Sequence, residues 1–105
     1  MPRRLVPQVA KHVGNAISSG RPYLLNRVDS LQARANRRFA LRGLGRAGRR
    51  RSWDEYPFAS SAQGGKGASV ASVPLSENLA QGGLIGAAYR LQDIKPGDCY
   101  WVIVF

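Results

Sequence analysis

Two adjacent carboxylates, Asp54 and Glu55, follow the most basic run of the chain, residues 49–51, and lie between aromatic side chains. A basic surface beside isolated acids suits phosphodiester cleavage, because cations hold the phosphates while carboxylates hold a divalent metal or activate water. Successive side chains of a strand point to opposite faces, so we expect only one of the two carboxylates to face the site. A second polar pair, Glu77 and Asn78, lies at the predicted start of a helix.

Basic and acidic side chains are divided unequally along the chain. Residues 1–51 contain thirteen Lys or Arg and one acid, whereas residues 52–105 contain three Lys or Arg and five acids. The net charge of +10 indicates a polyanionic partner, with nucleic acid as the first candidate and an acidic protein as the second. We predict a single domain of 105 residues, with a basic helical part that positions DNA over residues 1–51 and a catalytic part over residues 52–105.

The cysteine content and the length of the apolar runs limit which covalent links, metal sites and membrane segments this domain can have. The single cysteine, Cys99, permits no disulfide within the chain and no cysteine-based metal site. The N-terminus lacks the apolar core of a signal peptide, and no apolar run reaches the length of a transmembrane helix. If the domain leaves its cell, we expect another route, such as the end of a larger secreted protein.

Apolar periodicity and turn residues predict three helices and four strands. His12, the only histidine, lies near the apolar stripe of the first helix. It is interpreted either as a helix-surface or half-buried histidine without a function, or as a contact to phosphate. The last strand is apolar enough to lie inside the sheet. The helices are expected at residues 8–18, 31–41 and 77–91, the strands at 23–25, 53–58, 70–73 and 100–105, and a glycine-rich loop at 59–68.

Arginines are concentrated on the second predicted helix and in the Gly/Arg-rich connector at residues 43–51. Most charged helix faces are simply solvated, but the density of arginine without acidic partners favours phosphate contact here. The connector is expected to be mobile until nucleic acid binds. The predicted nucleic-acid-binding residues are Arg34, Arg37, Arg38, Arg42, Arg49, Arg50, Arg51 and Lys66.

The predicted order from residue 53 onward is strand, glycine-rich loop, strand and helix, which is the layout of the ββα-metal nucleases. In that layout, a residue on the first strand faces metal ligands on the helix. The predicted fold class is therefore α+β: a small ββα-metal (His-Me finger-like) nuclease domain with N-terminal helices and a short antiparallel sheet.

Several motifs over about residues 51–105 resemble those of the NucA/NucB-type deoxyribonucleases. Upstream segments at residues 7–12, 19–22 and 36–38 resemble versions fused to the C-termini of bacterial polymorphic and Rhs-type toxins. The motifs that carry the first resemblance are Asp54-Glu55-Tyr56-Pro57-Phe58-Ala59-Ser60, Gln63-Gly64-Gly65, Val73-Pro74, Glu77-Asn78 and Gln81-Gly82-Gly83.

The resemblance implies a metal-dependent endonuclease in which an aspartate stands where many ββα-metal enzymes use a histidine as base. Carried over residue by residue, Asp54 becomes the general base, Glu77 the leading metal ligand, and Asn78 a ligand or an orienting group. The predicted catalytic residues are Asp54, Glu55, Asn78 and Gln81, and the predicted metal ligands are Glu77, Asp54 and Asn78. For Glu55, metal binding and a salt bridge with Arg50 or Arg51 are both open.

The expected cofactor is Mg²⁺ or Mn²⁺, because these hard cations take oxygen ligands and keep several waters. DNA binding through phosphates would be salt-sensitive and largely independent of sequence. We expect the toxin domain of a secreted effector, acting in the cytoplasm of a target cell and neutralised by an acidic immunity protein. Three alternatives remain: a ribonuclease with the same site, a nucleic-acid-binding module without catalysis, and a basic domain that binds an acidic protein.

Overall fold

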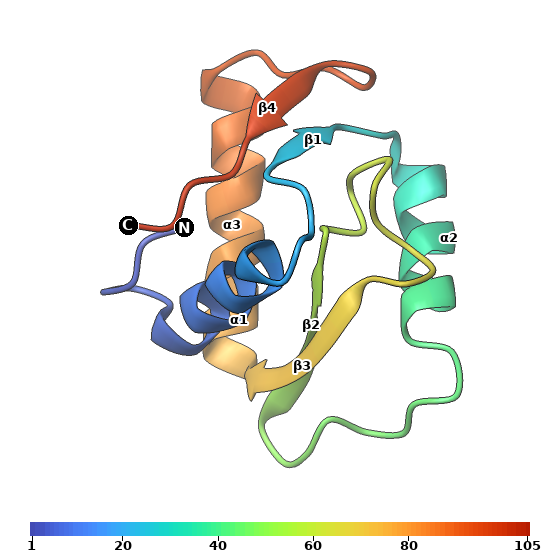
Figure 1. The fold of residues 1–105 in the computed structure, drawn as a ribbon, viewed down its shortest axis with the longest axis vertical. Helices are drawn as coiled ribbons and strands as arrows, with labels where there is room; N and C mark the ends of the chain where they lie inside the picture. Colours follow the sequence, from blue (N-terminus) through green and yellow to red (C-terminus); the bar gives the residue numbers. More distant parts are fainter.

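The computed structural model describes residues 1–105 and shows an α+β fold with short antiparallel sheets. No helix is both long enough and apolar enough to cross a bilayer. The two ends of the chain meet: the backbone N–H of Arg3 donates to the Phe105 carbonyl, and the N–H of Phe105 donates to the Met1 carbonyl (Figure 1). In chain order, the elements are α1 (Pro7–Ser18), β1 (Leu24–Asn26), α2 (Ser30–Ala40), β2 (Arg51–Tyr56), β3 (Ser69–Pro74), α3 (Leu75–Leu91) and β4 (Cys99–Trp101).

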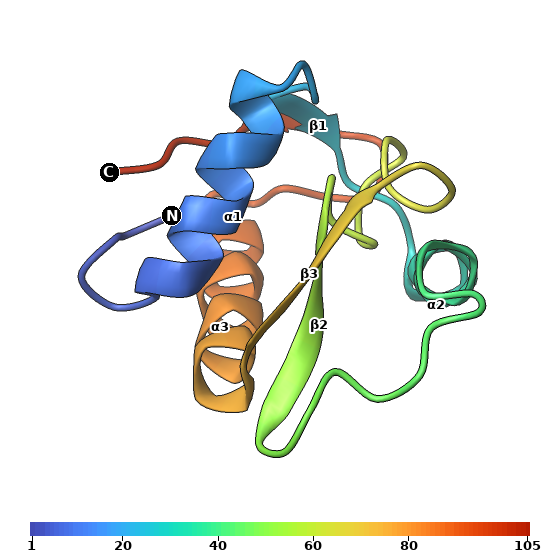
Figure 2. The same cartoon turned by 60° about the horizontal axis from the view of Figure 1, so that its bottom comes forward.

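The central feature is the antiparallel pair β2 and β3, whose register places Asp54 opposite Ala71 and Glu55 opposite Val70. Helices α1 and α3 cover one face of this pair, while α2 lies on the other side (Figure 2). Since β2 is bonded to β3 alone, its second edge is free of strand pairing. The hairpin thus stands between two unequal helical layers, with an open edge.

Helix α1 provides the core contact with the hairpin. It begins at Pro7, whose fixed φ suits the first helical position, and Val9, Val13 and Ala16 recur on one buried face. Burying a valine or leucine side chain contributes roughly 1.5–3 kcal/mol, so this face anchors the fold. The buried apolar cluster comprises Val6, Val9, Val13, Ala16, Leu25, Tyr56, Phe58 and Val73.

A second, smaller sheet joins β1 to β4, with Leu25 opposite Tyr100. The expectation of a buried strand over residues 100–105 is wrong, because β4 ends at Trp101 and the side chains of Trp101, Ile103 and Phe105 are exposed. The chain beyond β4 still makes backbone hydrogen bonds, with the N–H of Val102 donating to the Tyr23 carbonyl.

Helix α2 is attached to the rest of the domain through polar contacts. Its predicted apolar stripe does not enter the core, because Leu31 and Phe39 are exposed and Asn36 is the one buried residue of the helix. The Asn36 amide donates to the carbonyls of Ala59 and Ser61, at 3.0 and 2.9 Å. The loop that follows β2 is therefore bonded directly to α2.

Helix α3 begins two residues before the predicted start and runs without interruption through Gly82 and Gly83. Each of these glycines costs about 1 kcal/mol relative to alanine in a helix, so the pair weakens α3 without interrupting it. Its predicted stripe is only partly right, because Leu79 and Leu91 are exposed. The side chain of Gln81, by contrast, is buried.

Candidate active site

A polar cavity of about 230 Å³ lies beside β2, where α3, the loop after β2 and one arginine of α2 meet. It brings together the four residues predicted to be catalytic, which are Asp54, Glu55, Asn78 and Gln81, and adds Arg37. The remaining lining residues are Phe58, Ala59, Ser60, Gly82 and Ile85.

Both carboxylates of β2 line this cavity, so the expectation that only one would do so is wrong. The alternation of the strand is kept, because Asp54 contacts His12 of α1 whereas Glu55 contacts Arg37 of α2. Both residues nevertheless line the cavity, and no strand covers the second edge of β2. Asp54 is 1% exposed and Glu55 is 6% exposed, so any reaction here takes place at desolvated carboxylates.

Glu55 forms an ion pair, as one of its two interpretations allowed, but with a partner that the sequence did not indicate. Its Oε2 accepts a hydrogen bond from Arg37 Nη1 at 2.6 Å, and neither Arg50 nor Arg51 is its partner. Its other oxygen, Oε1, is buried and has no hydrogen-bond partner. Burial raises the pKa of Glu55, the Arg37 guanidinium opposes this, and the nearby Asp54 adds to the rise.

Asn78 and Gln81 are three positions apart on α3, which places both on the face that borders the cavity. The Asn78 amide nitrogen donates to Ser52 Oγ at 2.7 Å, which fixes the amide plane. Gln81 is 5% exposed, and its Nε2 is buried without a partner. Buried polar groups are usually bonded, so the donor Nε2 of Gln81 and the acceptor Oε1 of Glu55 are open to a water or a ligand in this cavity.

Glu77 is not brought to this cavity. Its Oε1 accepts hydrogen bonds from the backbone N–H groups of Gln8 and Val9, at 2.8 and 3.1 Å. Helix α1 has no side-chain cap of its own at Val6, so Glu77 satisfies free N–H groups at the start of that helix from a different element. Glu77 therefore caps α1 although it lies on α3.

No group of three or more His, Cys, Asp and Glu side chains is close enough together to hold a metal ion. The cavity instead offers two carboxylates, from Asp54 and Glu55, and two amides, from Asn78 and Gln81. Mg²⁺ typically takes one or two protein carboxylates and retains several waters, so this oxygen-rich set suits such an ion.

His12 is largely buried, with 9% of its side chain exposed, in agreement with the half-buried interpretation. Its Nδ1 lies 2.6 Å from Asp54 Oδ2, and its Nε2 lies 2.9 Å from Ser69 Oγ. The sequence did not indicate this link, because residues 12 and 54 lie on elements far apart in the chain.

The eight predicted nucleic-acid-binding side chains are all exposed. Three of them, Arg34, Arg37 and Arg38, line a shallow groove along α2. Arg37 lines both this groove and the polar cavity, so the basic surface of α2 leads directly to the buried carboxylates.

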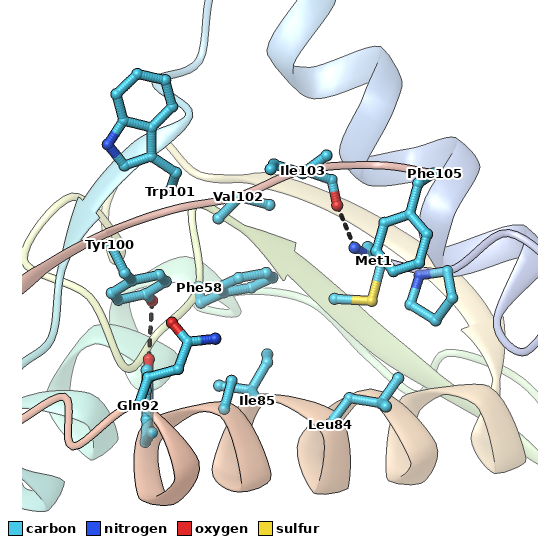
Figure 3. Close-up of a pocket in the computed structure, with 13 residues that line it drawn as sticks. Met1, Phe58, Leu84, Ile85, Gln92, Tyr100, Trp101, Val102, Ile103 and Phe105 are labelled. Atoms are coloured by element: carbon cyan, nitrogen blue, oxygen red, sulfur yellow. Dashed lines mark hydrogen bonds between the residues drawn. The ribbon is translucent and has the colours of Figure 1, made fainter.

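A larger cavity of about 350 Å³ has a different character (Figure 3). Leu84 and Ile85 of α3 face the segment after β4 across it, and none of its lining side chains is charged. One of its walls carries the Tyr100 hydroxyl, which is hydrogen-bonded to the Tyr89 hydroxyl at 2.8 Å. With no charged side chain in its lining, this space suits a phosphodiester less well than the polar cavity, which is therefore the candidate site.

Among the residues that line the polar cavity without having been predicted for it, two carry polar or charged side chains, Ser60 and Arg37. Ser60 ends the same sequence motif that contains Asp54, and that proximity is the signal that could have identified it. Arg37 was predicted as a DNA contact alone, and no spacing in the sequence links it to Glu55.

Comparison with known proteins adds one positive finding. The family model described as Deoxyribonuclease NucA/NucB matches residues 16–103, which is nearly the whole chain. No match was found among curated proteins.

Proposed function

The chain belongs to the NucA/NucB deoxyribonuclease family and is thus a nuclease domain, and from this premise we propose a metal-dependent endonuclease that cuts DNA largely without regard to sequence. The observation that carries the proposal is the polar cavity. It combines two buried carboxylates, two unpaired polar atoms and an arginine shared with the basic groove of α2.

The arrangement of β2, β3 and α3 supports a ββα-metal site. Asp54 lies on the first strand of this unit, and Asn78 and Gln81 lie on the helix that follows the second strand. All three line one cavity, as the layout requires of a base on the strand and ligands on the helix.

The residues present fit a small divalent cation. The unpaired Oε1 of Glu55 lacks a positive partner in the cavity, and the amides of Asn78 and Gln81 add oxygen donors beside it. When bound, Mg²⁺ or Mn²⁺ would neutralise charge on the phosphate and on the departing oxygen. We propose that Glu55, Asn78 and Gln81 hold this ion. Glu77, with one oxygen already bonded to α1, is the weaker candidate.

Asp54 is proposed as the general base. Its Oδ2 is bonded to His12, which leaves Oδ1 to accept a proton from a water in the cavity. Arg37 uses Nη1 for Glu55, and because 48% of its side chain is exposed, its other N–H groups remain available to a phosphate. Arg37 would thereby hold the scissile phosphate between the basic groove and the carboxylates.

Recognition of DNA is proposed to rest on phosphates. The exposed cations of α2 and of the loop before β2 are arginines, which bind phosphate oxygens through several N–H groups at once. Contacts of this kind position a duplex without reading its bases. The expected products are therefore fragments with no sequence preference.

The biological setting follows from the toxin-like segments at residues 7–12, 19–22 and 36–38. We propose that this domain is the toxin part of a secreted effector, acts in the cytoplasm of a target cell and meets an acidic immunity protein in the producing cell. The net charge of +10 supports an acidic inhibitor, since opposite charges speed association.

The test is cleavage of a supercoiled plasmid with Mg²⁺ or Mn²⁺, with and without EDTA, by the native chain and by Asp54→Ala and Glu55→Gln. We expect the native chain to cut the plasmid only when metal is present. In both variants we expect the cleavage rate to fall by at least about 100-fold, because each removes a group that acts in the transition state. Single-stranded RNA of matched length serves as the second substrate.

Glu77→Gln is the control variant. It weakens the bonds to α1, and we expect lower stability but retained cleavage below the unfolding temperature. Cutting that survives Asp54→Ala would refute the proposed site. Loss of cutting in a folded Glu77→Gln variant would indicate that Glu77 is a metal ligand after all. Cleavage of RNA in preference to DNA would indicate a ribonuclease. Binding of nucleic acid without cleavage under any metal would indicate a binding module that is not an enzyme.

A further inference from the structure

We infer that His12 is a positioning residue for Asp54: it donates a hydrogen bond from Nδ1 to one carboxylate oxygen and so fixes the other toward the cavity. The assignment rests on the proposed function, because it gives His12 a part in the same cleavage reaction. His12 precedes residues 16–103, so it lies outside the segment that the family model matches.

The geometry consists of a chain of three side chains from three elements. Asp54 Oδ2 of β2 lies 2.6 Å from His12 Nδ1 of α1, and His12 Nε2 lies 2.9 Å from Ser69 Oγ at the start of β3. A ring bonded at both nitrogens has one orientation, and a carboxylate bonded to that ring is held in turn. His12 is the only protein group bonded to the Asp54 carboxylate.

The proton positions follow from the chemistry of the two partners. An ionised carboxylate only accepts hydrogen bonds, so Nδ1 must carry a hydrogen when Asp54 is the base. A serine hydroxyl both donates and accepts, so Ser69 is compatible with Nε2 with or without its hydrogen. The Asp54 contact therefore selects the Nδ1–H form of the neutral ring, and Ser69 stabilises it.

A merely structural histidine would not need this arrangement. The core beneath α1 is closed by Val9, Val13 and Ala16, and Asp54 contributes no apolar surface to it. Asp54 is 1% exposed yet lines the cavity, so its free oxygen can be directed at a water only if the carboxylate does not rotate. The bond to His12 prevents that rotation.

The kinetic experiment compares cleavage of a plasmid by the native chain with that by His12→Leu, His12→Asn, Ser69→Ala and Asn15→Ala, in Mg²⁺ and in Mn²⁺. The Asn side chain carries an amide N–H close to the position of Nδ1, whereas Leu carries none. We expect kcat to fall about 10- to 100-fold in His12→Leu with KM unchanged, the usual cost of losing a group that orients a ligand. We expect kcat of His12→Asn to lie close to the native value, and kcat of Ser69→Ala to fall less than that of His12→Leu. Asn15→Ala, an exposed change on the same helix, should leave kcat unchanged.

A second measurement does not depend on activity. Because the chain has a single histidine, proton–nitrogen NMR of the imidazole reports on His12 alone. We expect hydrogen on Nδ1 in the native chain, and loss of this preference in Asp54→Ala. The thermal unfolding of each variant is recorded alongside.

The outcomes separate the two proposals. If the native chain cuts and Asp54→Ala does not, but folded His12→Leu cuts as fast as the native chain, the role of His12 is refuted and the proposed function stands. A ring with hydrogen only on Nε2 also refutes it, even if His12→Leu fails to fold. If the native chain cuts nothing, or if Asp54→Ala cuts fully, the proposed function fails and the role of His12 fails with it.

Discussion

Glu55 has two oxygens in unlike surroundings, and this asymmetry gives the residue its proposed role. Oε2 is bonded to Arg37 at 2.6 Å, while Oε1 is buried with no partner. An unpaired buried oxygen of a charged group costs more than about 1–3 kcal/mol, so the fold retains a locally unfavourable atom at this position. A cation in the cavity would supply the missing partner, and Arg37 alone does not.

The raised pKa of Glu55 predicts a stability change with pH in the metal-free chain. Between the ordinary value of 4.5 and the raised folded value, the folded chain holds the proton more tightly than the unfolded chain. The contribution of Glu55 to the free energy of unfolding is therefore full below the ordinary pKa and falls as pH rises through the folded one. Urea unfolding in EDTA at several pH values should show this fall, and Glu55→Gln should flatten it.

The control for this prediction is Asp93→Asn, which removes an exposed acid paired only with Lys95 at 3.8 Å. We expect that variant to keep the pH profile of the native chain. If the profiles of Glu55→Gln and the native chain run parallel, Glu55 is not the group responsible.

At the scale of elements, Asn36 links α2 to the loop that borders the cavity. It is the buried residue of α2 and donates to the carbonyls of Ala59 and Ser61. The same loop carries Gly65, where an added Cβ would lie 3.1 Å from Asn36 Oδ1, so the two segments pack closely. The distance between Arg37 and Glu55 depends on this attachment.

Replacing Asn36 with alanine should loosen α2 and the site together. The buried Ser61 carbonyl and the part-buried Ala59 carbonyl lose their donor, and leaving a buried group unpaired costs about 1–3 kcal/mol. We expect a lower melting temperature together with a fall in kcat, because Ala59 and Ser60 of this loop form part of the cavity wall. Arg38→Ala, an exposed change on the same helix, should leave the melting temperature unchanged. Equal stabilities of the two variants would contradict the linking role.

Most elements were predictable because their signals are local. The spacing of Val9 and Val13 predicts α1, and turn residues separate β2 from β3, so element types and approximate bounds agree with the structure. The same reasoning failed for α2: Leu31 and Phe39 have the spacing of core residues, but both side chains are exposed. Periodicity reveals which residues share a face, but it does not reveal whether anything covers that face.

The site was predictable as far as its motif extends. Asp54, Glu55, Asn78 and Gln81 meet in one cavity, as the motif led us to expect. The bonds of Glu77 to α1 and of His12 to Asp54 join residues about forty to seventy positions apart. Contacts of that range depend on how helices pack on the hairpin, and no spacing within the sequence encodes them.

At the scale of the whole molecule, charge is distributed to favour one approach of a polyanion. The basic side chains of residues 1–51 include the groove of α2, whereas the acids that could attract a cation are buried beside it. A duplex lying on α2 would thus contact Arg37 at the mouth of the cavity. Under the proposed function, the electrostatic field of residues 1–51 would attract the DNA toward the polar cavity.

This distribution predicts the salt dependence of binding. Arg34→Ala and Arg38→Ala should each weaken duplex binding equally for all sequences, and each should lower the slope of log K against log salt by about 1. The measurement is fluorescence anisotropy in EDTA across a range of NaCl concentrations. Lys95→Ala, in the turn before β4, should leave the slope unchanged; an equal effect there would show that total charge matters more than the groove.

Because the two ends of the chain lie next to each other, the domain is suited to circular permutation. Arg3 and Phe105 are joined by a backbone hydrogen bond, so a short linker could close the polypeptide into a ring. Domains with adjacent ends tolerate circular permutation when new ends open in an exposed loop. The exposed stretch between α2 and β2 offers such a place, near Gly43, where no heavy atom of another segment lies within 4 Å of an added Cβ. A permuted chain opened there would begin with the hairpin of β2 and β3 and end with the arginine-rich helix α2, so the order in which these two parts are synthesised would be reversed.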